Sequence, residues 1–330
     1  MVAKQQSVEN VWRQVRELFQ GVDPQALAQE SDRPVCVALV ARGPGALRQM
    51  EEFFVPRYLR PRKAEETRRK LALFLVPVHP SEHQAFFDCD LAVCSEGATE
   101  EIGNDAPQRF VFRPENPQAV LKEILQQRGD LALPLAKNFL PFRRLVQRRW
   151  IQSVALENTL FAMLATIAEE VPAPLALLPA TPAIGRRFAP GSPALASDSL
   201  QQLEGEARAA FLTANQMRLA FLIAASSDST VGFQEQRGQV TAVVAAALGW
   251  RVLARGMEQK MPSGSRLLTR GLLAFLSTYT VGLALEQFHA WGRSLTREEK
   301  SEAYEQTYCL GRRMLDEVLE RMAARARSAA

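Results

Sequence analysis

Apolar residues in the first third of the chain form short runs, separated by polar and turn-forming residues. Val35–Val40 (VCVALV) is a near-continuous apolar run, which is typical of a strand buried on both faces of a parallel sheet. Three further runs of strand length follow, at Leu71–Val78, Asp90–Cys94 and Arg109–Phe112. Helical stretches alternate with them, through Met50–Phe54 and over Pro117–Gln127. This alternation predicts βαβ units and a small parallel sheet.

The pattern changes near Leu131. Alanine and leucine become dominant and recur with helical spacing, which predicts helices near 142–169, 200–227, 234–259, 264–292 and 296–327. The proline-rich stretch 171–195 interrupts them and is predicted to be a non-helical connection. The predicted fold is an α/β N-terminal domain followed by an all-α helical domain. We place a helix and connector in 1–31, the α/β domain in 32–130 and the helical domain in 131–330.

The composition is that of a globular protein, with 47% apolar and 23% charged residues. A net charge of +4 is too small to indicate nucleic-acid binding. Four scattered cysteines indicate reduced thiols rather than a disulfide framework. The charged N-terminal segment lacks the apolar region of a signal peptide. The longest uncharged runs, Val171–Gly185 and Gly271–Leu285, have fifteen residues each, whereas spanning a membrane takes about 20. We therefore expect a cytoplasmic protein.

The turn after the first strand tests for a phosphate-binding loop. Such a loop needs G-x-x-x-x-G-K-[ST], in which backbone N–H groups and the lysine bind phosphate and the hydroxyl holds Mg²⁺. The best register spans Ala41 to Arg48 and places Ala41 and Ala46 at the glycines, Leu47 at the lysine and Arg48 at the hydroxyl. Arg42, Gly43 and Gly45 fill the remainder of this vestigial loop. Neither Arg42 nor Arg48 replaces a metal-binding hydroxyl, so we predict a turn that binds no cofactor.

Two other GTPase motifs are also missing. The second long strand ends in Val76-Pro77-Val78-His79-Pro80, where a GTPase has Asp-x-x-Gly. The last strand is followed by Arg113-Pro114-Glu115-Asn116, where a guanine-reading Asn-Lys-x-Asp is expected. The loss of three motifs together predicts a protein that does not hydrolyse nucleotide.

Several stretches carry a family resemblance, namely Leu135–Asn158, VPAPLALLP at Val171–Pro179, TANQMRLAFLIAA at Thr213–Ala225 and the helical pair Gln236–Leu285. With them the chain resembles bacterial GTPase-related proteins that carry a YcjF-type uncharacterised helical domain behind a G-domain. The resemblance covers roughly residues 131–320 and is weaker over the α/β part. It implies a degenerate GTPase-like domain tied to a helical domain that often lies at, or in, the inner membrane. Charges such as Glu169, Glu170 and Arg251 depart from that pattern and oppose insertion.

Two histidines and two cysteines form a candidate metal site. His79, His83, Cys89 and Cys94 are ligand types that suit zinc. The simpler interpretation is surface histidines beside a buried strand cysteine. Polar residues at Thr213, Asn215 and Gln216 in an apolar helix raise a similar choice. They either line a polar site or cap the helix and join neighbouring helices through buried hydrogen bonds.

Two basic clusters are candidates for contact with a membrane or a partner. Arg57–Lys70 holds seven basic residues against two acidic ones. The second cluster comprises Arg143, Arg144, Arg148 and Arg149 with the adjoining Trp150. Either can meet anionic lipid headgroups, at about 1 kcal/mol for each cation near the surface. The alternative is a solvated helix face whose long side chains cover apolar neighbours.

These observations predict a non-catalytic interaction or scaffold protein built on a pseudo-GTPase domain. We expect no cofactor, no metal and no nucleic-acid partner. The expected partners are an unidentified protein and, through weak contact, an anionic membrane surface. The sequence also allows a homo-oligomer. One alternative is a nucleotide-binding switch with an atypical loop. A weaker alternative is a metal-dependent enzyme that uses His79, His83, Cys89 and Cys94.

Overall fold

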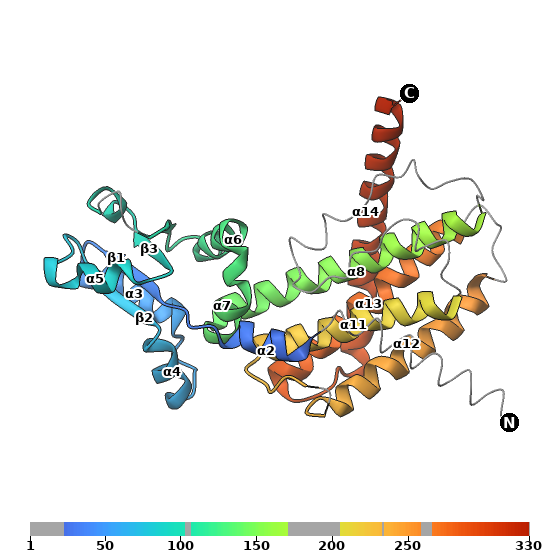
Figure 1. Cartoon of the computed structure of the whole chain (residues 1–330), viewed down its shortest axis with the longest axis horizontal. Coiled ribbons are helices and arrows are strands. Elements are labelled where there is room, and N and C mark those ends of the chain that lie inside the picture. Colours follow the sequence, from blue (N-terminus) through green and yellow to red (C-terminus); the bar gives the residue numbers. More distant parts are fainter. Residues whose placement is uncertain (1–22, 103–106, 171–204, 233, 259–265, 330) are drawn as a thin grey trace. The chain divides into compact units, whose positions relative to one another are not determined.

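The computed structural model describes residues 23–102, 107–170, 205–232, 234–258 and 266–329. Most of the predicted N-terminal helix, and the whole proline-rich stretch 171–195, lie outside the described residues. The chain divides into two compact units. An α/β unit comprises the described residues of 28–147 with 225–229, and a helical unit comprises the described residues of 148–224 and 230–329 with 23–27. Each unit is described by itself below (Figure 1).

A four-stranded parallel sheet forms the centre of the α/β unit. Its strands are β1 (Val37–Ala41), β2 (Leu71–Leu75), β3 (Leu91–Ser95) and β4 (Arg109–Phe112). They are ordered β2-β1-β3-β4, and Val37 of β1 is in register with Leu71 on one side and Leu91 on the other. The predicted small parallel sheet is therefore confirmed. This order matches the first four strands of the doubly wound order 2-1-3-4-5.

The helices that follow the strands in this unit are α3 (Pro44–Phe54), α4 (Pro61–Arg68), α5 (His83–Phe87) and α6 (Pro117–Gln127). Three of them, α3, α4 and α6, begin with proline. Proline suits the first turn because the N–H it lacks would have no helical acceptor there. The short helix α2 (Pro24–Asp32) precedes β1 along the chain. The predicted helix over Pro117–Gln127 matches α6.

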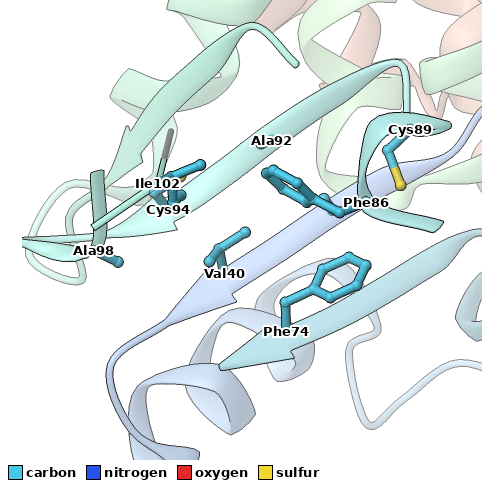
Figure 2. Close-up of a cluster of buried hydrophobic side chains, with 9 residues drawn as sticks. Val40, Phe74, Phe86, Cys89, Ala92, Cys94, Ala98 and Ile102 are labelled. Atoms are coloured by element: carbon cyan, nitrogen blue, oxygen red, sulfur yellow. The ribbon is translucent and has the colours of Figure 1, made fainter. Parts of the chain in front are cut away.

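Alternate residues of the strands pack two different layers. One face carries Val40, Phe74, Ala92 and Cys94, and Phe86 of α5 covers it (Figure 2). Between β3 and β4 the same face is covered by a loop rather than a long helix, through Ala98 and Ile102. On the opposite face α3 packs against β1 and β2, and its Phe53 ring lies 5.5 Å from that of Phe112. The sheet thus lies between two apolar layers.

The α/β unit extends past the boundary predicted at residue 130. Helix α7 (Ala132–Asn138) and the first turns of α8 (Leu140–Glu170) belong to it. Phe54 of α3 lies 5.8 Å from Phe139 and 6.2 Å from Phe142, ring centre to ring centre. Apolar side chains of α3 thus hold these two segments to the sheet layers.

A short distant segment completes the α/β unit. The Gln147 amide donates to the hydroxyls of Ser226 and Ser227, at 2.8 and 2.9 Å. The Lys63 ammonium lies 2.6 Å from the Asp228 carboxylate. Residues 225–229 are therefore bonded to parts of the unit that precede them by far along the chain.

The helical unit holds the remaining described helices. The later residues of α8 are followed by α11 (Gly205–Ser226), α12 (Arg237–Glu258), α13 (Arg266–Trp291) and α14 (Arg297–Ala329). These bounds agree with the five helices predicted from periodicity to within a few residues. Every described side chain from Thr213 to Ser226 of α11 is buried, so this helix is covered on all sides.

Close approach within this unit depends on a glycine. A Cβ on Gly282 of α13 would come within 2.7 Å of Ile151 of α8 and 3.1 Å of Leu219 of α11. The three helices therefore pack at Gly282 because it lacks a side chain.

One of the described helices, α13, is long and apolar enough to cross a membrane by length and composition. Its apolar window has a mean hydropathy of 1.3, and half of that window is buried inside the protein. The core helix of a soluble protein satisfies the same criteria. The uncharged run from Gly271 to Leu285 has fifteen residues and forms the centre of α13. The helix continues beyond this run on both sides, so it is longer than the run of uncharged residues indicates.

Candidate functional site

The connection between β1 and α3 is where a phosphate-binding loop would stand. β1 ends at Ala41 and α3 begins at Pro44, so Arg42 and Gly43 alone connect them. The Leu47 amide donates to the Gly43 carbonyl at 3.2 Å, which commits Leu47 to the first turn of the helix. Cradling a phosphate takes a longer loop whose free backbone N–H groups surround the oxygens. The connection is instead a tight strand-to-helix turn.

The other residues of the vestigial loop are part of α3. Gly45, Ala46, Leu47 and Arg48 all have helical backbone. Arg48 lines a cleft of about 260 Å³ between α3 and α4, together with Glu51, Glu52, Arg57 and Arg68. Glu52 pairs with Arg57 at 2.7 Å and Glu51 with Arg68 at 2.9 Å. The charge of this cleft is thus largely balanced.

The carboxyl edge of the sheet carries a partly exposed ion pair. Doubly wound folds bind ligands where the strand order reverses, which here is between β1 and β3. Arg42, directly after β1, places its Nε 2.6 Å from a carboxylate oxygen of Glu101. Gly97, after β3, has a φ of +79°, and a Cβ there would approach the Arg42 guanidinium to 2.7 Å. The cation at this edge therefore has a protein carboxylate as its partner.

Further contacts fasten the loop that carries Glu101. The Arg109 guanidinium donates to the carbonyls of Thr99 and Ile102, both at 3.1 Å. Arg113, after β4, lies 3.5 Å from Glu96. Because Arg42 and Arg113 are both paired, an incoming anion would have to displace carboxylates from them.

The positions of the other two missing motifs have structural roles. After β2, the Val76 amide donates to the Ala41 carbonyl at 3.0 Å, and Val76 and Val78 pack against the α5 side of the sheet. After β4, Asn116 is the residue that precedes Pro117 at the start of α6. Its N–H donates to the Arg113 carbonyl at 3.0 Å. Both segments are turns that return the chain to the core.

The four candidate metal ligands do not come together. The His79 ring is bonded to the Ser81 hydroxyl at 2.7 Å, and the His83 ring donates to the Val78 carbonyl at 3.1 Å. Cys94 points into the sheet core, fully buried, and burial raises its pKa to about 12. Among the described residues no group of three or more His, Cys, Asp or Glu is arranged to hold a metal. The structure therefore does not assemble the candidate His₂Cys₂ group of the weaker alternative, because strand alternation turns Cys94 inward.

The second basic cluster is used largely inside the protein. Its five members are Arg143, Arg144, Arg148, Arg149 and Trp150. Arg143 donates to two carbonyls at the C-terminal end of α7, at 3.0 and 3.3 Å, and burial lowers its pKa. The Arg148 Nε lies 2.6 Å from the Glu286 carboxylate, and Trp150 is buried with 1% of its surface exposed. Arg144 is the exposed member of the set. Membrane contact by this cluster stays a prediction, with three of its five residues engaged internally.

The first basic cluster carries many carboxylate partners. Arg62 pairs with Glu66 at 3.1 Å within α4, and Arg69, directly after α4, pairs with Glu65 at 3.4 Å. Lys63 pairs with Asp228, as described above. Surface pairs of this kind contribute about 0–1 kcal/mol each, so their main effect is to lower the net field of α4.

Polar residues of α11 join three helices of the helical unit. The Asn215 amide donates to the Asn158 side-chain oxygen at 2.8 Å, and the Asn158 amide donates to the Thr278 hydroxyl at 2.8 Å. The Gln216 amide lies 3.3 Å from the Thr278 hydroxyl and 3.5 Å from that of Ser277. These bonds tie α11 to α8 and α13, as one of the two sequence interpretations expected. The capping role in that interpretation is wrong, because α11 already begins at Gly205.

Two features escaped the sequence analysis. One is an ion pair in the core of the helical unit, where the fully buried Arg218 lies 2.8 Å from Glu157. The other is the contact of Cys36 with Cys89, whose sulfur atoms are 2.8 Å apart. The strand order carries the signal for this contact, because Cys36 precedes β1 and Cys89 precedes the neighbouring β3.

The chain was compared with protein-family models, with curated proteins and with solved structures, and none of the three comparisons found a match.

Proposed function

We propose that this protein is a non-catalytic interaction protein, a scaffold built on a pseudo-GTPase α/β unit and a helical unit. The observation that carries the proposal is the two-residue connection of Arg42 and Gly43 between β1 and α3. In a nucleotide-binding fold of this kind that connection supplies the backbone N–H groups that hold the phosphates. Here it is too short to do so.

The charges at the sheet edge support the same proposal. A nucleotide would bring several negative charges to the point where Glu101 pairs with Arg42. A bound phosphate would break the Arg42–Glu101 ion pair and would lie close to the negative charge of Glu101. Both effects make phosphate binding less favourable. An edge whose cation already has a carboxylate partner suits a unit that presents its surface to a partner protein.

Direct titration tests the proposal. We expect the full chain to bind a fluorescent GTP analogue no more tightly than about 100 μM with Mg²⁺ present, which corresponds to about −5.5 kcal/mol. Magnesium-dependent binding in the micromolar range would show that the protein is the alternative, a nucleotide switch with an atypical loop. An active P-loop GTPase titrated in parallel establishes the sensitivity of the assay.

A matched variant separates loop length from residue chemistry. Leu47→Lys combined with Arg48→Ser restores the lysine and the hydroxyl but leaves the two-residue connection unchanged. We expect this variant to bind the analogue no better than the parent. If it gains magnesium-dependent binding, side-chain loss alone explains the missing affinity, and the argument from the short connection fails.

Capture from the native host tests the interaction part of the proposal. The tagged full chain should recover the same partner in equal amounts with EDTA, with GDP or with a non-hydrolysable GTP analogue. A scaffold is indifferent to these additions, whereas a switch changes its affinity between them.

Membrane contact remains a subordinate part of the proposal, for a cytoplasmic protein at the inner membrane face. Its cations would be exposed arginines such as Arg62, whose side chain is 93% exposed, and Arg144. Because neighbouring carboxylates reduce the field of α4, we expect weak binding to anionic vesicles that disappears as salt rises. Vesicle sedimentation measures this directly.

A further inference from the structure

Two cysteines meet at the amino ends of neighbouring strands. Cys36 directly precedes β1, and Cys89 lies two residues before β3. The Asp90 amide donates to the Cys36 carbonyl at 3.0 Å, and the Cys36 amide donates to the Asp90 carboxylate at 2.9 Å. This pair of bonds fixes the two chain segments beside each other and leaves the sulfur atoms 2.8 Å apart.

The two thiols have unequal surroundings. Cys89 is buried at the end of α5, beside Phe86 (Figure 2), and its thiol also lies 3.4 Å from the Ala85 carbonyl. Cys36 is partly exposed. The hydrogen bond from the Cys89 thiol lowers the pKa of Cys36, while the same bond and burial raise the pKa of Cys89. Of the two thiols, Cys36 is thus the one whose ionisation is favoured and whose residue is partly exposed, and Cys89 is its buried partner.

We propose that Cys36 and Cys89 form a reversible intramolecular disulfide, with a peroxide as the oxidant. The Cys36 thiolate attacks the O–O bond of hydrogen peroxide, which gives a sulfenic acid at Cys36 and releases hydroxide. The Cys89 sulfur then attacks the Cys36 sulfur, the S–S bond forms, and water leaves with the proton of Cys89. Two sulfur atoms supply the two electrons that reduce the peroxide.

The geometry favours closure between these two sulfurs. An S–S bond is about 2.0 Å long, so the atoms need to approach by less than about 1 Å. Backbone bonds on both sides already hold the segments in place. The disulfide would link the start of β1 to the turn between α5 and β3, and so fasten α5 to the sheet face that it covers.

Thiol counting on the full chain tests the proposal without any substitution. The reduced protein has four cysteines, and brief peroxide treatment should leave two reactive thiols after denaturation. Peptide mapping should find Cys36 joined to Cys89, and a thiol reductant should restore four. Thermal unfolding of the α/β unit should move upward by several degrees on oxidation and return on reduction. If mapping finds both cysteines separately alkylated after oxidation, the proposal is overturned.

Three variants sharpen the result. Cys36→Ser should lose the disulfide, and Cys89→Ala should accumulate a sulfenic acid at Cys36 that a dimedone probe labels. Cys309→Ser removes an exposed thiol of α14 and should form the disulfide as the parent does. An oxidised product that depends on Cys309 instead would show that the chemistry belongs to that exposed thiol and would overturn the assignment.

Discussion

The two units of this protein fill their interiors with different chemistry. The sheet of the α/β unit is packed on its α5 face by Val40, Phe74, Ala92 and similar apolar side chains. The helical unit buries Asn158, Asn215 and other amides and hydroxyls in its centre, and it also buries Arg218. The sheet layers of the first unit are joined by apolar contacts, whereas buried side-chain hydrogen bonds join the helices of the second.

The backbone explains this difference. Strands of a sheet are joined by a ladder of N–H to carbonyl bonds, which fixes their register without help from side chains. Helices satisfy their backbone groups internally, so the backbone leaves their rotation and sliding against neighbours unspecified. In the helical unit the Asn158–Thr278 and Asn215–Asn158 bonds specify that alignment.

The largest effect should come from removing one member of the buried ion pair. Arg218→Met removes the fully buried partner of the Glu157 carboxylate, whose own side chain is 15% exposed, and we expect a loss of about 3–5 kcal/mol of unfolding free energy. Trp150, Trp250 and Trp291 belong to the helical unit, so their fluorescence in denaturant reports on that unit.

Two further variants are matched to Arg218→Met. Arg313→Met replaces an exposed arginine of α14 and should change stability by no more than about 0.5 kcal/mol. Combining Arg218→Met with Glu157→Leu should recover most of the loss, because no unpaired charge then remains. If the double variant is as unstable as the single one, the pair is not the cause.

The next effect tests the polar link between helices. Asn158→Ala removes the acceptor of the Asn215 amide and the donor to Thr278, and we expect a loss of about 1–3 kcal/mol. Gln152→Ala, on the exposed side of the same helix, is the control and should be near neutral. Equal losses in the two variants would contradict a special role for the buried link.

The converse change belongs in the sheet. Val40→Thr keeps the shape of the side chain but places a hydroxyl among apolar neighbours, at a cost of about 1–3 kcal/mol. Leu73→Thr, on the 44% exposed side chain of the edge strand β2, should cost much less. Hydrogen exchange of the β1 and β3 amides measures both, and comparable costs would show that the α/β interior accepts polar groups as the helical one does.

The smallest effect concerns the start of α14. Thr296 and Glu299 form a capping box, in which each side chain accepts from the other's backbone N–H, at 3.2 and 2.8 Å. Thr296→Ala should cost about 1 kcal/mol of stability.

The hydrogen bond from Arg293 is the main cause that lowers the pKa of Glu299 to about 2. A lowered carboxyl pKa stabilises the folded state above the unfolded value, so this contribution should fade as pH falls from about 4.5 toward 2. Circular dichroism along an acid titration, with and without Glu299→Gln, measures it.

Much of the architecture could be predicted from apolar spacing. Parallel strands buried on both faces appear in the sequence as continuous apolar runs, and long helices repeat their apolar pattern over many turns. Both types of element could therefore be predicted. Strand ends were less predictable. The run Leu71–Val78 ends as a strand at Leu75, and Pro77 just beyond has no N–H to donate to a ladder. The run from Val35 begins as a strand at Val37, because the Cys36 amide bonds to the Asp90 side chain instead.

The long-range pairing of side chains could not be predicted from the sequence. Local motif reading identified the missing phosphate loop, since its residues are adjacent in the chain. Arg148 with Glu286, and Cys36 with Cys89, are far apart in sequence and meet only through tertiary packing. Spacing alone also suggested the His79–Cys94 metal group, which strand alternation then separates.

The attachment of residues 225–229 to the α/β unit has a consequence for the order of synthesis. A ribosome releases residues 28–147 first, and the hydroxyls of Ser226 and Ser227 reach Gln147 only after about eighty more residues have been made. Lys63 is made earlier still, so an even longer stretch of chain is synthesised before its partner Asp228. The nascent α/β unit therefore spends that interval with its last contacts unmade, and a gene fragment cut at residue 147 would keep it permanently in that state.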